Sequence, residues 1–182
     1  NICLNLAFFQ PTNLKDITLE NINVHLHGAF PKTSLWYYLF RQRVVDIEIW
    51  GADDEGQKTK IGTMPSSAIK PGGLTSNQRL FPSSNQQFSG HRLLFEYFCF
   101  PEKFLYIALE GVGDFIRRYG DSQNQNEKNT HHIENLSSIH IEFKLDHVLP
   151  LPDHPSIDNI RLFCSPAVNQ FQASARPFLL DP

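Results

Sequence analysis

The sequence lacks the features of several common functional classes. Among its 182 residues, 16 are Lys or Arg and 19 are Asp or Glu, so the formal net charge is −3. Nucleic-acid-binding domains usually carry a basic excess, which is missing here. No run of 18 or more apolar residues occurs, and the chain does not open on the basic and then apolar regions of a signal peptide. We therefore expect neither nucleic-acid binding nor insertion into a membrane.

Cysteine is also scarce. The three residues Cys3, Cys99 and Cys164 are widely spaced, odd in number and free of any C-x-x-C pair. Neither a disulfide framework nor a cysteine-rich zinc site fits this pattern. We expect buried, reduced thiols in a cytosolic protein.

Motifs for catalysis and phosphate binding are absent as well. Ser89–Gly90–His91 lacks the G-x-S-x-G pattern of a hydrolase nucleophile. Gly111–Val112–Gly113 lacks the third glycine and the lysine of a phosphate-binding loop, and Gly72–Gly73 lies in an expected loop. We predict no catalytic residue and no cofactor.

The chain is rich in phenylalanine and in alternating patterns. Its 15 Phe residues supply large buried areas, and a chain of this size can bury roughly 70% of its unfolded surface. Alternation of apolar and polar residues predicts strands, and helical spacing predicts helices. The expected strands cover 2–9, 22–26, 45–49, 59–64, 104–109 and 139–145, and the expected helices cover 34–41 and 90–99. Residues 160–164 are expected to form a last strand or a short helix. The fold class is therefore α+β, mostly antiparallel sheet with two or three helices.

The composition also suggests how the chain is divided. Residues 1–65 read as a strand–helix–strand subdomain, and residues 66–88 read as a long loop or linker. Residues 89–182 form the second unit, with a polar insertion at 120–137. These units could be two small subdomains or parts of one domain. Long loops often bind partners, so 66–88 is a candidate interface.

Two groups of residues could carry chemistry. His25 and His27 lie on the same side of an expected strand, but a zinc site needs at least one further ligand. Asp53–Glu55 is a carboxylate cluster just before Gly56, which is equally typical of an exposed turn. The ordinary interpretations, a solvated strand face and a turn, are favoured in both cases. We therefore predict no metal site.

The most informative segment is 90–105. Leu93, Leu94, Tyr97 and Phe98 form one apolar stripe at helical spacing. Pro101 ends this helix, and an apolar strand is expected to follow at once.

Residues 90–104 read G-H-R-L-L-F-E-Y-F-C-F-P-E-K-F, which resembles the signature G-Y-R-L-L-x-E-Y-F-x-F-P-E-K-F of the TssF family. This family, also called ImpG or VasA, comprises baseplate subunits of bacterial type VI secretion systems. Further segments that resemble family patterns, in the family's order, are 24–28, 68–72, 80–82, 163–171 and 175–177. Departures from the usual residues occur at His91, Gln170 and Arg176.

The resemblance implies a set of structural signature positions. These are Gly90, Arg92, Leu93, Leu94, Glu96, Tyr97, Phe98, Phe100, Pro101, Glu102, Lys103, Phe104, Pro166, Val168, Asn169 and Phe171. It also implies that the chain is an internal-to-C-terminal fragment, since TssF proteins are several times longer. The implied function is structural: a baseplate wedge component that is not an enzyme and that supports sheath polymerisation and effector delivery.

The resemblance further implies partners and a location. The partners would be TssG, TssK and TssE, a second TssF copy, the spike hub and the sheath, at a cytoplasmic position docked on the inner-membrane complex. We expect Trp36, Tyr37, Trp50 and Phe81 to be exposed aromatic residues at such interfaces. Glu102–Lys103 could fix the turn after the signature helix if it is packed. The alternative function is a carbohydrate-binding or hydrolytic β-rich domain.

Overall fold

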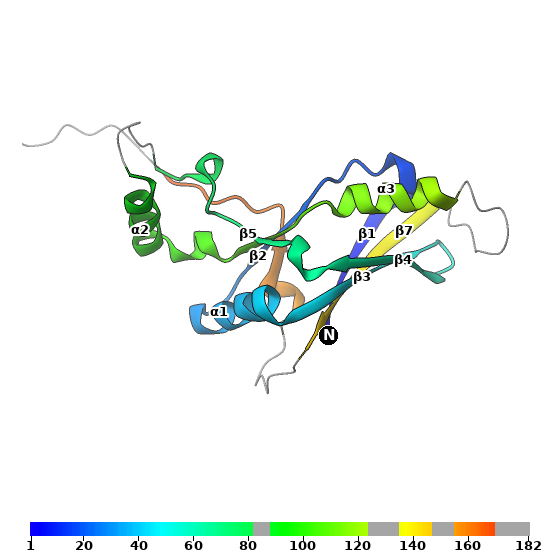
Figure 1. Ribbon diagram of the computed structural model, residues 1–182, viewed down its shortest axis with the longest axis horizontal. Coiled ribbons are helices and arrows are strands. Elements are labelled where there is room, and N and C mark those ends of the chain that lie inside the picture. The colour runs from blue at the N-terminus through cyan, green and yellow to red at the C-terminus, as the bar shows by residue number, and fades with distance from the viewer. Residues whose placement is uncertain (82–87, 124–134, 147–154, 170–182) are drawn as a thin grey trace, which may run out of the picture.

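The computed structural model describes residues 1–81, 88–123, 135–146 and 155–169 (Figure 1). The helices are α1 (Phe30–Tyr38), α2 (Ser89–Cys99) and α3 (Val112–Gln123). The strands are β1 (Ile2–Asn13), β2 (Ile22–Leu26), β3 (Val44–Ala52), β4 (Lys58–Pro65), β5 (Ile69–Pro71), β6 (Tyr106–Leu109), β7 (Asn135–Leu145) and β8 (Ile160–Leu162). These elements confirm the α+β prediction.

The strands form two antiparallel sheets of four strands each. The first has the order β1-β7-β3-β4, and the second has the order β5-β6-β2-β8. Both sheets combine strands from before residue 66 with strands from after residue 88. The division into subdomains around 66–88 stays a prediction. The strand pairings join the two proposed units in both sheets.

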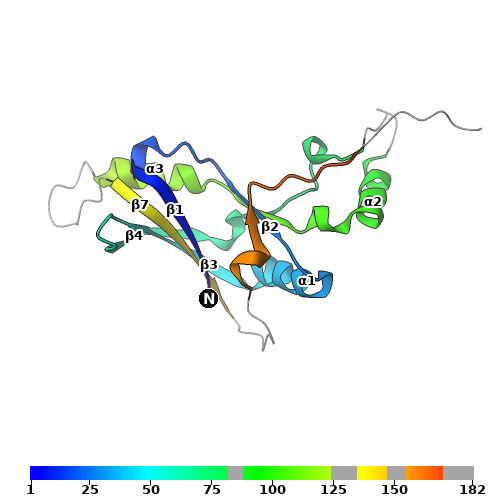
Figure 2. The same ribbon diagram turned by 180° about the vertical axis from the view of Figure 1, so that it is seen from behind.

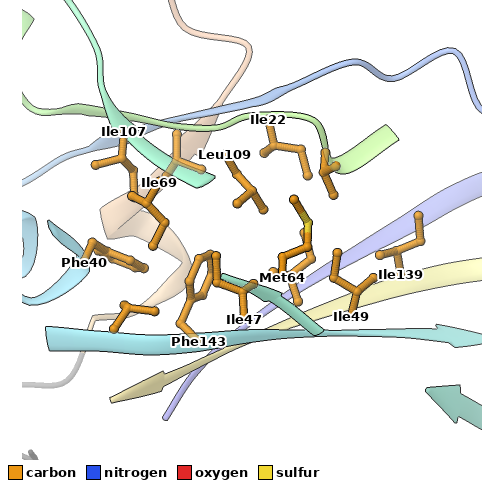
Figure 3. Close-up of a cluster of buried hydrophobic side chains, with 14 of the residues drawn as sticks. Ile22, Phe40, Ile47, Ile49, Met64, Ile69, Ile107, Leu109, Ile139 and Phe143 are labelled. Atoms are coloured by element: carbon orange, nitrogen blue, oxygen red, sulfur yellow. The ribbon is translucent and has the colours of Figure 1, made fainter. Parts of the chain in front are cut away.

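A single apolar core lies between the two sheets (Figure 3). Ile47 and Ile49 of β3 face Ile107 and Leu109 of β6 across this space, and all four are almost fully buried. Phe40, from the π-helical turn Leu39–Arg43 after α1, packs edge-on against Phe143 with ring centroids 5.0 Å apart. The alternating patterns of the sequence thus mark the inner faces of both sheets.

Local irregularities explain two wrong predictions within the strands. Pro11–Thr12–Asn13 is a typical turn sequence and predicts a turn after residue 10. The turn is absent, because β1 continues to Asn13 with a register shift between Ala7 and Thr12. Pro11 falls within that shift and on an edge strand, where its missing N–H breaks no ladder. The alternation of Val45, Ile47 and Ile49 predicts that these three side chains share the buried face. Val45 is half exposed instead, because the register also shifts between Val44 and Asp46.

Several segments are more ordered than their composition indicates. The expected loop 66–88 contains β5 and two 3₁₀ turns at Ser66–Ala68 and Ser76–Gln78. Helix α3 was not predicted, and its last turn takes up the start of the polar stretch 120–137. The sequence also predicts a stiff linker at Pro150, Pro152 and Pro155 and an extended end at 172–182. Of these residues, only Pro155 lies in the described part of the chain.

Two further findings concern the surface. Cys3, Cys99 and Cys164 are all exposed, so the prediction of buried thiols is wrong. No helix among the described residues is long and apolar enough to cross a membrane.

Candidate interaction surface

Helix α2 lies at the end of the molecule opposite α3, beyond the second sheet, in both views (Figures 1 and 2). The predicted apolar stripe exists, but three of its four residues point outward and only Leu93 is half-buried. Phe98 is 80% exposed and Leu94 58% exposed. Phe95 and Tyr97 are about as open to solvent as Leu94. None of the four residues of this stripe belongs to the described core.

The buried side of α2 is charged. Glu96 is fully buried, and its carboxylate pairs with the equally buried ammonium group of Lys103. The other Glu96 oxygen accepts the backbone N–H of Leu80 at 3.0 Å and lies 3.5 Å from that of Phe81. Through these bonds, the carboxylate of Glu96 in α2 contacts both the turn that follows the helix and the segment 80–81 that precedes it. Buried charges are tolerated when they are paired and hydrogen-bonded in this way.

These partners set the ionisation of Glu96. Burial alone would raise the pKa of the carboxyl group, because it disfavours the charged form. The hydrogen bonds from Lys103 and from the Leu80 amide outweigh burial and hold the pKa of Glu96 below its ordinary value. Glu96 is therefore ionised at neutral pH, as the pairing with Lys103 requires.

Arg92 adds a second cation to the same side of the helix. Its guanidinium lies 3.5 Å from Glu96 and its side chain is only 9% exposed. The predicted pair Glu102–Lys103 is not the pair that forms, since Lys103 bonds to Glu96, seven residues earlier in α2. Lys103 does fix the turn after the helix, as the packed alternative required.

The end of α2 follows the proline signal with one difference. Helix α2 ends at Cys99, and Phe100 has φ −153° and ψ 74°, outside both the helical and the extended regions. A 3₁₀ turn at Pro101–Phe104 then precedes β6, where a strand was expected directly. The ring of Phe104 packs against that of Tyr97 at 5.7 Å between centroids. The 3₁₀ turn therefore packs against α2 through the contact between Phe104 and Tyr97.

Two glycines allow the neighbouring loop to pass close to this turn. A Cβ at Gly73 would lie 2.6 Å from the carbonyl oxygen of Lys103, and Gly73 has φ +79°. A Cβ at Gly72 would lie 2.5 Å from Cβ of Tyr106. Only glycine fits such an approach.

The second group of signature positions lies beside the first. A cavity of about 270 Å³ is lined by Lys103, Leu80, Ser165 and Pro166, among others. Val168 and Asn169 are exposed, and Phe171 lies outside the described residues. The fold thus brings the segment around 165 next to the turn after α2.

The four aromatic residues expected at interfaces have different surroundings. Trp36 is 2% exposed in the core, so the prediction that it is exposed is wrong. Tyr37 and Trp50 are half-buried, with the Lys60 ammonium 5.7 Å from the Trp50 ring centroid. Phe81 is half-buried against Phe95 of α2, with centroids 5.1 Å apart. Of these four, Phe81 alone adjoins the exposed side of α2 in the described residues.

The other candidate groups resemble ordinary structure. The rings of His25 and His27 are 6.2 Å apart, and the described residues hold no group of three or more side chains able to share a metal ion. Burial lowers the pKa of His25 more than the Glu102 backbone raises it, so the neutral form is favoured. Asp53 accepts the backbone N–H of Gln57 at 2.8 Å and so closes the β3–β4 turn.

Comparison with solved structures identifies the class of fold. A chain in the cryo-electron microscopy structure of a type VI secretion system TssK-TssF-TssG baseplate subcomplex has a similar fold, with a TM-score of 0.54 and 23% identity. The match covers 81% of this chain and 24% of that one. The fold is therefore one found in a component of a large protein assembly.

Comparison of sequences identifies the family. The profile of the family described as "Type VI secretion system, TssF" matches residues 1–182, so the chain belongs to the TssF family. Type VI secretion system component TssF1 of Pseudomonas aeruginosa is 26% identical over 157 residues, which is 85% of this chain and 22% of that protein. The chain thus spans between a fifth and a quarter of the length of the relatives that it matches.

Proposed function

We propose that this chain is part of a structural component of the type VI secretion baseplate and acts by binding sister subunits, without catalysis. Membership of the TssF family supports this proposal. The single observation that carries it is the outward-facing aromatic side of α2, in the segment that matches the family signature. A side this apolar, held in place by a buried ion pair, suits a permanent interface better than a solvated surface.

TssG and TssK are the partners that we propose first. The similar solved chain comes from a complex that contains both proteins. TssE, a second TssF copy, the spike hub and the sheath are further proposed contacts within the same assembly. In this proposal the protein works in the cytoplasm, docked on the inner-membrane complex, where it supports sheath polymerisation. No specific observation favours the carbohydrate-binding or hydrolytic alternative.

The test is to mix the complete protein that contains this chain with TssG and TssK from its own organism and to measure the mass by light scattering. We expect a stable complex of defined stoichiometry. Three folded proteins that stay separate at micromolar concentration would contradict the proposal.

A further inference from the structure

We infer that β8 is an acid-sensitive edge strand, which stays paired with β2 while His25 is neutral and detaches when His25 gains a proton. The change takes place within this chain, so the inference does not depend on the proposed function. His25, β8 and the groups that face them all belong to the described residues.

The attachment of β8 to the second sheet is slight. It has three residues, forms the edge of that sheet and pairs with β2 (orange in Figure 2). Its apolar residues, Ile160 and Leu162, are only half-buried. Just before the strand, Asn159 accepts the backbone N–H of His27 at 2.8 Å and donates its side-chain amide to the carbonyl of His27 at 3.0 Å. Short, half-exposed elements of this kind open at low cost.

Backbone strain lies directly after β8. Phe163 has φ 57°, in the left-handed region that bulky side chains rarely adopt, and it is the one non-glycine residue with positive φ among those described. Its ring is 97% exposed, so side-chain packing does not hold this conformation in place. Opening of β8 would release the strain, which therefore favours the open form.

His25 is the titratable group nearest to β8 on its partner strand. It lies directly opposite Arg161 of β8 and, on the other side of β2, directly opposite Tyr106 of β6. Its ring lies 4.5 Å from that of Tyr106 and 6.2 Å from that of His27, between centroids. Side chains directly opposite each other in an antiparallel pair are neighbours, and like charges there weaken the pairing. A proton on His25 therefore places a second positive charge beside Arg161.

The groups around His25 divide into those that oppose this charge and one that favours it. Arg161 and His27 oppose it, whereas Glu102 favours it through its backbone and its carboxylate. Tyr106 contributes a neutral ring. Burial, together with His27 and Arg161, outweighs Glu102 and lowers the pKa of His25 below its ordinary value of 6.5.

The sign of the pH effect follows from this balance. Opening of β8 reduces the burial of His25 and separates it from Arg161, so the open form binds a proton more readily. The closed form is therefore fully stabilised above the ordinary pKa and loses that stabilisation as the pH falls toward the lower native pKa. Ser165 and Pro166, which follow β8, line the 270 Å³ cavity beside Lys103. Detachment of β8 would remove this wall and free the edge of β2.

The test is hydrogen–deuterium exchange of the complete protein at about pH 7.5 and about pH 5.5, with rates corrected for the intrinsic effect of pH. Protection of the amides at 160–162 should fall roughly three- to fivefold at the lower pH, whereas that of β7 should stay unchanged. His25→Gln should abolish this response, and Arg161→Gln should reduce it. His140→Gln is the matched control, because burial also lowers the pKa of this strand histidine, in the first sheet. It should respond as the wild type does.

Phe163→Asn tests the strain separately. Asn adopts the left-handed backbone more readily than Phe, so exchange at 160–162 should slow at both pH values while their ratio stays unchanged. Arg161→Gln keeps the test decisive even if His25→Gln loosens β8 at neutral pH, because it leaves His25 in place. Equal protection of 160–162 at both pH values in the wild type would overturn the inference. So would a full wild-type response in Arg161→Gln.

Discussion

At the scale of single residues, the buried carboxylate of Glu96 determines how the signature segment is arranged. It accepts hydrogen bonds from Lys103 and from the amide of Leu80, so three separate pieces of backbone meet at one side chain. A buried ion pair adds little net stability compared with an apolar pair of the same shape, but the loss of one partner is costly. We interpret Glu96 and Lys103 as residues that position α2.

Replacing Glu96 with Gln tests this interpretation. Gln keeps an oxygen for the Leu80 amide but leaves the Lys103 ammonium buried without a counter-charge. We expect a loss of about 3–5 kcal/mol in the free energy of unfolding, measured by urea denaturation. Adding Lys103→Met removes the orphaned charge and should recover most of this loss. A double variant as unstable as Glu96→Gln alone would show that the charge pair is not the cause.

The acid sensitivity of the protein should also depend on Glu96. Because the native pKa lies below the ordinary value of 4.5, the unfolded chain binds a proton more readily than the folded one. The stabilisation is therefore complete above the ordinary pKa and is lost as the pH falls through the lower native pKa. Urea unfolding from about pH 6 to about pH 3 should show a steeper loss for the wild type than for Glu96→Gln/Lys103→Met. Parallel curves for the two proteins would contradict this role.

At the scale of elements, helix α3 is positioned by a close approach that involves glycine. A Cβ at Gly113 would lie 1.4 Å from the carbonyl oxygen of Leu19. A Cβ at the nearby Gly111 would meet nothing within 4 Å, although Gly111 has φ +71°. These two positions separate the cost of a clash from the cost of backbone strain.

We expect Gly113→Ala to lower the free energy of unfolding by about 2–3 kcal/mol, because α3 must move away from the chain at Leu19. Gly111→Ala should cost about 1–2 kcal/mol, from the left-handed backbone alone. Chemical denaturation of both variants provides the comparison. Equal losses, or a larger loss at Gly111, would rule out the clash as the dominant effect.

Sequence patterns predicted those elements whose apolar side faces this chain's own core. The alternation in 139–145 predicted most of β7, because that strand is buried on one face. Helical spacing predicted the extent of α2 but not its orientation, since the apolar period marks the apolar side without showing what covers it. The position of Glu96 and Arg92, both opposite the stripe, was the available clue.

The misses among the elements have simple physical causes. β5 has only three residues, too few for a pattern. Helix α3 contains two glycines, Gly113 and Gly120, and has few apolar residues, which weakened its helical signal. Partners that lie far apart in the sequence, such as Glu96 and the Leu80 amide, cannot be derived from spacing at all.

At the scale of the whole molecule, the two sheets around one core form a body from which α2 extends at one end (Figures 1 and 2). The core uses apolar residues from both sheets, whereas α2 keeps its apolar side outside. This arrangement supports the proposal that the chain completes its burial within a larger assembly. The same exposed face should also make the isolated 182-residue chain prone to self-association.

Self-association of the isolated chain is measurable by light scattering over a range of concentrations. We expect the mean mass to rise with concentration and the Phe98→Asp variant to show less of this rise than Phe9→Asp, the matched control at a fully exposed position on β1. The difference follows from the loss of the largest exposed apolar group on α2. A wild-type chain that stays monomeric to millimolar concentration would contradict the expectation.

The most direct test of the account is hydrogen–deuterium exchange of the complete protein, measured alone and in its complex with TssG and TssK. The account predicts that amides of α2 at 91–99 exchange more slowly in the complex, while those of the buried strands β3 and β7 change little. A stable complex in which α2 exchanges as fast as in the free protein would contradict the claim that this helix is an assembly surface.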